Sequence, residues 1–190
     1  MVSILFITSN EHKVEEANRI LSQFGIQLEM FPQKKIEIQS KSLLKIAKYA
    51  AHMAAKRLKS PVLVEDSGLF IRALKGFPGP FSSYIHETIG CEGVLKLLSG
   101  IEDRYAVFKC AVAFCSPSLG LNTFQGRSIG RISLNMRGQA GFGFDPIFVP
   151  HGEELTFAEM LPEQKDRFSH RGAALRAFGS WLSSKSMAKP

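Results

Sequence analysis

Residues 61–70, with the sequence PVLVEDSGLF, constrain the fold of this chain more than any other stretch. The apolar, β-branched run 62–64 is typical of a buried strand. We expect the strand to end in two carboxylates, Glu65 and Asp66, at the edge where open α/β sheets bind ligands. Adjacent carboxylates repel each other unless a cation lies beside them, and Gly68 would allow a tight turn with positive φ out of the site. A capped strand end with solvated acids is the alternative.

The composition is that of an ordinary globular protein with a basic surface. Of 190 residues, 45% are hydrophobic and 22% are charged, so one α/β domain or two closely packed lobes can bury a substantial core. The net charge of +7 favours polyanionic partners, either nucleic acid or free nucleotide. Cys91, Cys110 and Cys115 lack CxxC spacing and indicate buried thiols. We recognise neither a signal peptide nor a membrane span, and expect a cytoplasmic protein.

The first part of the chain predicts an anion site between a strand and a helix. Residues 3–7 have the alternation of a strand, and the apolar spacing of residues 14–24 predicts a helix. The linking sequence TSNEHK, from Thr8 to Lys13, supplies small polar residues before the first helical N–H groups, which attract anions. Simple capping of the helix, with a solvated lysine, is the alternative.

The middle of the chain predicts a helix, a stiff loop and a hairpin. Apolar positions at helical spacing fall within residues 43–58, with lysines on the opposite face. Before this helix, Glu37 sits between two isoleucines, as an outward-facing strand residue would. The glycine–proline loop 76–84 is too stiff and apolar for a disordered linker and predicts a lid or a pocket wall. Residues 105–114 and 121–132 alternate as the two strands of a hairpin.

Two later segments bring aromatic and basic residues. In the sequence GFGFDPIFV of residues 141–149, glycines let the backbone approach a ligand and phenylalanines offer surfaces for a base to stack on. Aromatic packing under a loop is the alternative. The run 163–172 places Lys165, His170 and Arg171 just before a final amphipathic helix. Positive charge at a helix start is unfavourable unless an anion lies there, so this placement hints at a ligand.

Four segments together carry a family resemblance: TSNEHK at 8–13, EDSGL at 65–69, FGFDP at 142–146 and SHR at 169–171. Their order and spacing resemble the inosine triphosphate pyrophosphatase family, also described as dITP/XTP pyrophosphatases, from residue 3 to about residue 182. The resemblance implies an elongated α/β fold in which helices flank a mixed β-sheet. It also implies a homodimer. The expected organisation is a single domain over residues 1–190, with two lobes around a central cleft and a frayed tail from about 183 to 190.

The resemblance also implies an activity, which is Mg²⁺-dependent hydrolysis of aberrant purine nucleoside triphosphates such as ITP, dITP and XTP. The products would be the monophosphate and pyrophosphate, and the role would be house-cleaning of the nucleotide pool. Asp66 would be the general base and a metal ligand, and Glu37 the second metal carboxylate. The residues that would contact the substrate are Thr8, Ser9, Asn10, Glu11, His12, Lys13, Ser67, Phe142, Gly143, Phe144, Asp145, Lys165, His170 and Arg171.

The chemistry of a triphosphate agrees with these roles. About four negative charges must be neutralised by magnesium and donor groups before a nucleophile can approach. We expect Asp66 to deprotonate a water that attacks the α-phosphorus, and Lys13 and Lys165 to hold the pyrophosphate. Arg171 carries only donors, so we expect it to pair with the C6 carbonyl of hypoxanthine or xanthine but not with the amino group of adenine.

Two other functions fit parts of the sequence. A Maf-like pyrophosphatase of other nucleotides would begin with a serine-rich, arginine-containing loop, whereas this chain carries Asn10 and Lys13 there. A basic nucleic-acid-binding module would need a stripe of arginines and lysines, and the carboxylates of Glu65 and Asp66 argue against it. We therefore expect a purine nucleoside triphosphate as the partner, with no nucleic acid and no membrane.

Overall fold

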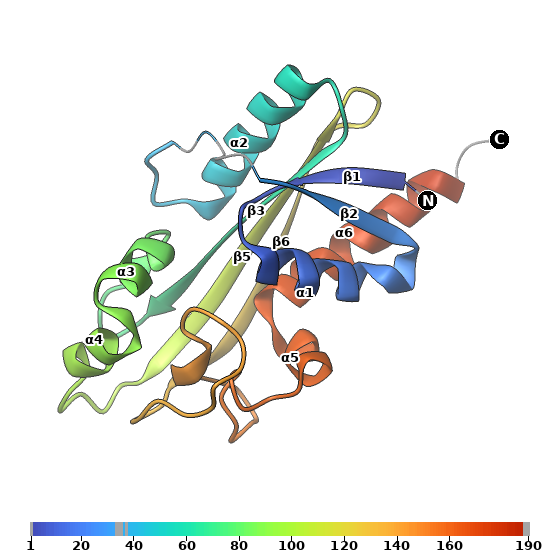
Figure 1. Cartoon of the computed structure of the whole chain (residues 1–190). Coiled ribbons are helices and arrows are strands. Elements are labelled where there is room, and N and C mark those ends of the chain that lie inside the picture. The colour runs from blue at the N-terminus through green and yellow to red at the C-terminus, as the bar shows by residue number, and fades with distance from the viewer. Residues whose placement is uncertain (1, 33–35, 37, 188–190) are drawn as a thin grey trace.

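The computed structural model describes residues 2–32, 36 and 38–187, and within these residues seven strands form one mixed sheet (Figure 1). The strands are β1 (Val2–Ile7), β2 (Ile26–Phe31), β3 (Val62–Ile71), β4 (Pro78–Gly79), β5 (Tyr105–Ser116), β6 (Gly120–Ile132) and β7 (Phe148–Pro150). Their order is β2-β1-β3-β5-β6-β7, and β4 pairs with the end of β3. Pairing is parallel among β2, β1 and β3 and antiparallel from β3 onward, which confirms the expected mixed α/β class.

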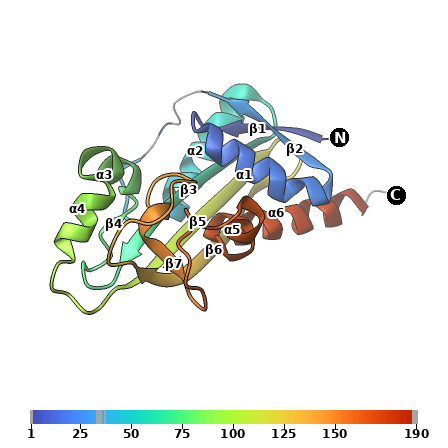
Figure 2. The same cartoon turned by 60° about the horizontal axis from the view of Figure 1, so that its bottom comes forward.

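Helices cover both faces of this sheet. They are α1 (Glu11–Leu21), α2 (Leu43–Leu58), α3 (Ser82–Thr88), α4 (Gly90–Leu97), α5 (Pro162–Phe168) and α6 (His170–Met187), with short 3-10 turns η1 (Ser22–Phe24) and η2 (Asp145–Ile147). In Figure 2, α1 lies in front of the strands, while α2 lies behind them. In the part of the chain that is described, none of these helices has the length and apolar character to span a membrane.

The alternation of side chains along β3 decides which helix packs on which face. Leu63 points toward α1 and α6 and packs in one core with Phe178. Its neighbour Val64 points the other way and packs in a second core with Ala47 of α2. Side chains at odd and even positions of β3 therefore lie on opposite sides of the sheet, and this alternation includes Glu65 and Asp66.

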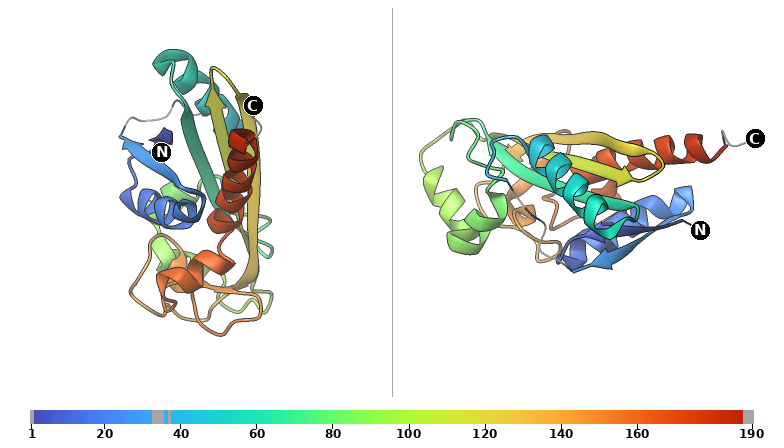
Figure 3. Two further views of the ribbon diagram at one scale, coloured as in Figure 1. Left: turned by 90° about the vertical axis from the view of Figure 1, so that its right-hand side faces the viewer. Right: turned by 90° about the horizontal axis from the view of Figure 1, so that it is seen from above.

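A third core lies at the other end of the long strands. Leu69 and Ile71 of β3 pack there with Val94 of α4 and with Phe148 and Phe157 from the segment after β6. Figure 3 shows the elongated molecule that results, with α3 and α4 at one end and the start of β1 and the end of α6 at the other. The strands β3, β5 and β6 connect the two ends.

Two local expectations differ from the structure. The strand β3 does not end at the carboxylates but continues to Ile71, because β5 pairs with it along all ten residues. Gly68 is therefore extended and forms no turn, and glycine is required because a Cβ atom would lie 2.1 Å from the carbonyl oxygen of Gly79. In addition, α6 continues to Met187, beyond residue 183, where we expected a tail to begin.

Candidate active site

The loop between β1 and α1 has the geometry of a capped helix N-terminus at the edge of the sheet. Asn10 is the N-cap, and its side-chain oxygen accepts a hydrogen bond from the amide of Lys13 at 3.2 Å. The hydroxyl of Thr8 accepts from the amide of Asn10 at 3.1 Å, which fixes the start of the loop. The expected order of strand, polar loop and helix is thus confirmed.

This loop lies beside a gap in the pairing of β3. Residues 5–6 of β1 pair with residues 62–63, and β4 pairs with residues 69–70. Between these two pairings, along residues 64–68, no strand of the described chain lies beside β3 on that side. The carboxylates and Ser67 therefore lie next to the loop that begins at Thr8.

Glu65 and Asp66 face opposite sides of the sheet at this gap. Glu65 is buried on the side of α1 and α6, where Lys13 Nζ lies 2.6 Å from one carboxylate oxygen and Arg171 Nη2 lies 3.3 Å from the other. Burial raises the pKa of Glu65, but Arg171 and Lys13 outweigh it and hold the pKa well below its usual range. Asp66, opposite Ala111 in the register, lies on the side of α2 and is 8% exposed. The positive charge beside Glu65 comes from the side chains of Lys13 and Arg171. Glu65 and Asp66 therefore do not form one site.

A network of buried charged side chains joins α1, α5 and α6. Glu16 of α1 accepts from both Arg171 and Lys165, the latter at 2.5 Å. Lys165 also lies 2.6 Å from Asp145. Burial raises the pKa of Glu16, but Arg171 and Lys165 outweigh it and lower the pKa to about 2. For Asp145, burial prevails over Lys165 and raises the pKa. Each buried cation thus has a carboxylate partner, so the network orders α1, α5 and α6 relative to one another.

An aromatic cavity of about 280 Å³ opens from the gap on the side of α1 and α6. Phe142 forms one wall and carries two cations on its ring, with Lys165 Nζ at 4.8 Å and Arg171 Cζ at 5.3 Å from the centroid. His170 stacks on Phe108 with a centroid distance of 4.6 Å. The other lining residues are Asn10, Lys13, Ser67, Gly68, Ser82, Ser83, His86, Glu87, Gly143, Phe144 and Asp145.

His170 is a buried polar side chain in the lining of this cavity. Burial and the nearby Arg171 lower its pKa to about 3, so the imidazole is neutral near neutral pH. Its Nδ1 atom has no hydrogen-bond partner among the residues described. A buried polar atom of this kind is costly unless a water or a ligand satisfies it.

The structure brings together most of the residues that the sequence predicts for the site, but not all. The loop residues Ser9 and Glu11 are exposed and do not line the aromatic cavity. His12 is also exposed and stacks on Phe142 with a centroid distance of 5.4 Å. Phe144 lines the cavity but is also part of a core. Glu37, predicted as a metal ligand, lies outside the described residues.

Two contributions to the site were not predicted from the sequence. Glu16 sits among the apolar positions of α1, and a charged residue on a buried stripe is a signal that could have been used. The helix α3 forms a wall of the cavity with residues that include His86 and Glu87. The segment 76–84 was predicted as a lid or wall, and its residues Ser82 and Ser83 line the cavity; the remainder of α3 carries no motif that marks it.

The fold and the site define a mixed α/β protein in which a capped helix N-terminus, the buried carboxylate of Glu65 and an aromatic cavity meet at a gap in the sheet. The chain belongs to the Ham1 family, whose model matches residues 4–181. It is 50% identical to the dITP/XTP pyrophosphatase of Methanopyrus kandleri over 95% of this chain and 96% of that protein. It is 47% identical to the dITP/XTP pyrophosphatase of Thermococcus kodakarensis over 94% and 96% of the two chains.

Solved structures agree with this assignment. The Ham1 protein of Staphylococcus aureus superposes with a TM-score of 0.84 at 27% identity and covers 97% of this chain and 100% of its own. The HAM1 protein of Coxiella burnetii gives 0.82 at 31% identity, with the same coverage. The family predicted from the four motifs is thereby confirmed.

Proposed function

We propose that this chain is a nucleoside triphosphate pyrophosphatase that hydrolyses aberrant purine nucleotides, ITP, dITP and XTP, to the monophosphate and pyrophosphate. The observation that carries the proposal is the gap beside residues 64–68 of β3, where Lys13 of the loop 8–13 contacts Glu65 and the aromatic cavity opens. The base would occupy the cavity and the phosphates would extend along the gap toward Asp66. The activity named for the relatives from Methanopyrus kandleri and Thermococcus kodakarensis supports this reading.

In this mechanism Asp66 accepts a proton from a water molecule whose oxygen attacks the α-phosphorus. A bond forms between that oxygen and the α-phosphorus. The bond from the α-phosphorus to the oxygen that bridges to the β-phosphorus breaks, and pyrophosphate leaves with the electron pair. The amides at the start of α1 and the side chain of Lys13 lie where they can hold the phosphates. Lys13 would then exchange its contact with Glu65 for one with the substrate.

A divalent cation fits the donor set at this point. Magnesium takes oxygen ligands and keeps several waters, so one or two carboxylates suffice. Asp66 would be one ligand, and Glu37, outside the described residues, the predicted second. Glu65 is not available, because it faces the other side of the sheet and is held by Lys13 and Arg171. When bound, magnesium would neutralise phosphate charge that the lysines alone cannot.

Recognition of the base is assigned to the aromatic cavity. Phe142 offers a flat surface for stacking, and the neutral His170 offers a ring nitrogen. Arg171 keeps the proposed role toward the C6 carbonyl, with a restriction. Its Nη1 atom donates to Glu16, and its Nη2 atom donates to both Glu65 and Ser67, so a base would be read by the second N–H of Nη1 or by Nε. Lys165, committed to two carboxylates, is better suited to fixing Phe142 than to holding pyrophosphate.

Release of pyrophosphate tests the function directly. The purified chain is supplied with magnesium and with ITP, XTP, dUTP or ATP, and phosphate is measured with and without added inorganic pyrophosphatase. We expect phosphate from ITP and XTP only when the coupling enzyme is present. Phosphate that appears without the coupling enzyme would mean stepwise removal of phosphates, and a preference for dUTP would mean a different substrate class.

We further propose a homodimer that works in the cytoplasm. Phe81 and Tyr84, at the start of α3, are 47% and 66% exposed, and apolar side chains of this size suit an interface. The three cysteines are free and buried, as is usual in a reducing compartment. Light scattering coupled to size-exclusion chromatography would give a mass of two chains if the dimer forms.

A further inference from the structure

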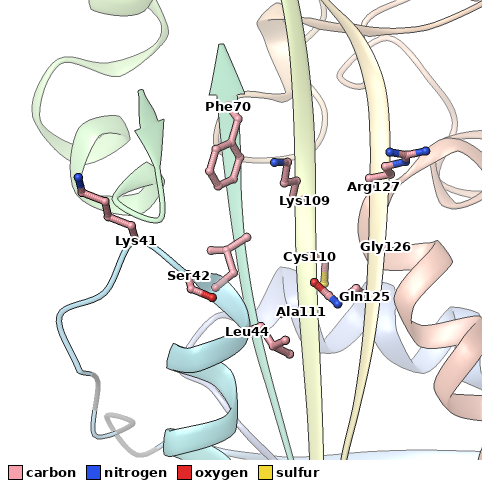
Figure 4. Close-up of a pocket in the computed structure, with 11 residues that line it drawn as sticks. Lys41, Ser42, Leu44, Phe70, Lys109, Cys110, Ala111, Gln125, Gly126 and Arg127 are labelled. Atoms are coloured by element: carbon pink, nitrogen blue, oxygen red, sulfur yellow. The ribbon is translucent and has the colours of Figure 1, made fainter. Parts of the chain in front are cut away.

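A second cavity, of about 510 Å³, lies on the opposite side of the sheet from the aromatic cavity, where α2 begins. Its walls come from the loop before α2 and from β3, β5 and β6 (Figure 4). Figure 4 shows Lys109 and Arg127 on neighbouring strands, with Phe70 beside them and Lys41 on the loop that leads into α2. No part of the proposed chemistry so far uses this cavity.

The polar lining of this second cavity is strongly basic. Lys109 and Arg127 are direct cross-strand partners in the register of β5 and β6, so their side chains lie on the same face and repel each other. Lys41 adds a third positive charge, and the lining contains no carboxylate. In the described part of the chain none of these three cations forms an ion pair. An anion in the cavity would relieve this repulsion.

The cavity also has features that orient an anion. Lys109 Nζ lies 4.5 Å from the ring centroid of Phe70, which holds the lysine over the floor of the cavity. Ser42, in the lining, is the N-cap of α2, a helix of 16 residues whose dipole adds favourable potential for negative charge. Side-chain charge and the helix terminus thus act on the same space.

Asp66 is not among the residues that line this cavity, but it lies on the same face of the sheet. It pairs in register with Ala111, which lines the cavity, and its position places it on the same face of β3 as Phe70. Lys109 is two residues from Ala111 along β5, which is about 7 Å in a strand. A chain of phosphates whose first phosphorus lies at Asp66 therefore reaches Lys109 and Arg127 with its last.

We propose that Lys41, Lys109 and Arg127 form an anion subsite that receives the terminal phosphates of the nucleotide and holds pyrophosphate after cleavage. This inference rests on the proposed function, because it takes Asp66 as the point of cleavage. It divides the substrate between two faces of the sheet, with the base on the side of α6 and the leaving group on the side of α2.

Binding of inorganic pyrophosphate in the presence of magnesium, measured by calorimetry, tests the subsite. The variants are Lys109→Met and Arg127→Met, and Lys56→Met, which removes an exposed lysine in the last turn of α2, is the matched control. Each subsite variant should weaken pyrophosphate about tenfold, as expected for loss of one hydrogen bond between charged groups. The affinity for IMP, which lacks the terminal phosphates, should stay within twofold, and the control should match the parent for both ligands.

The outcomes separate the subsite from the function. If the parent binds no pyrophosphate, or if both subsite variants bind it within twofold of the parent, the subsite is wrong even where ITP is hydrolysed. If the parent hydrolyses neither ITP nor XTP, while the two variants lose pyrophosphate affinity as stated, the subsite stands and the proposed function fails. Equal losses for pyrophosphate and IMP would also overturn the subsite, because they would reflect a general change in the fold.

Discussion

The carboxylates of Glu65 and Asp66 lie on opposite faces of β3, although the two residues are adjacent in the chain. Glu65 lies 2.6 Å from Lys13 Nζ and belongs to a buried network on the side of α1 and α6. Asp66 lies on the side of α2, which is also the side on which the basic cavity opens. We therefore assign a structural role to Glu65 and the role of general base to Asp66.

The two acids should therefore respond differently to loss of charge. Asp66→Asn should lower kcat for ITP by about 10²–10⁴-fold, the usual contribution of a general base. Glu65→Gln should instead lower the free energy of unfolding, because Arg171 and Lys13 lose a buried partner. Steady-state kinetics and urea titration of both variants check this. Near-normal turnover of Asp66→Asn would remove its assigned role.

Glu16 should make stability depend on acid pH. Its pKa falls from 4.5 to about 2 on folding, so its contribution is complete above pH 4.5 and is lost as the pH falls toward 2. The difference in unfolding free energy between the parent and Glu16→Gln should therefore grow by about 3 kcal/mol from pH 2 to pH 6. Urea titrations at several pH values measure it. Parallel curves for the two proteins would contradict the assigned network.

Phe142 should act on the base through its flat ring. Phe142→Leu should raise KM for ITP about tenfold, since stacking of one base on an aromatic side chain contributes ~1–3 kcal/mol. Phe142→Trp keeps a flat surface and should stay close to the parent. KM for ITP is measured for the parent and for both variants under the same assay conditions. The same rise in both would show that Phe142 acts by packing and not by stacking.

Gly68 should tolerate no side chain, for a reason that lies in the neighbouring loop. The Cβ of Gly68→Ala would meet the carbonyl oxygen of Gly79, to which Ser82 also donates at 2.7 Å. We expect a loss of about 1–3 kcal/mol in unfolding free energy from this overpacking. Ser83→Ala, on the exposed side of α3, serves as the control and should change stability little. Stability of Gly68→Ala equal to the parent would mean that the loop can move away.

Much of the secondary structure follows from local pattern. The helix at Leu43–Leu58 has the predicted bounds, because apolar periodicity and a capping residue mark it. The end of β3 was not predictable in the same way. Glu65 and Asp66 break the apolar run, but pairing with β5 carries the strand on to Ile71, and that pairing is a property of the fold.

Several residues that line the aromatic cavity belong to the motifs read from the sequence, but their arrangement was not predictable. Asn10, Lys13 and Arg171 line that cavity, whereas the roles assigned to them and to Asp66 stay predictions. Which face of the sheet each one occupies depends on strand register, and a shift by one residue would exchange Glu65 with Asp66. The contact of Arg171 with Glu16 joins two helices far apart in the chain, so no local pattern contains it.

The central claim is that a nucleotide lies across the gap beside β3, with its base against Phe142 and its α-phosphorus at Asp66. A crystal structure of Asp66→Asn with ITP and magnesium tests it most directly. We predict the hypoxanthine ring on Phe142, the α-phosphate beside the side chain at position 66, and the terminal phosphates on the side of α2. A triphosphate that lies wholly on the side of α6, away from position 66, would contradict the account.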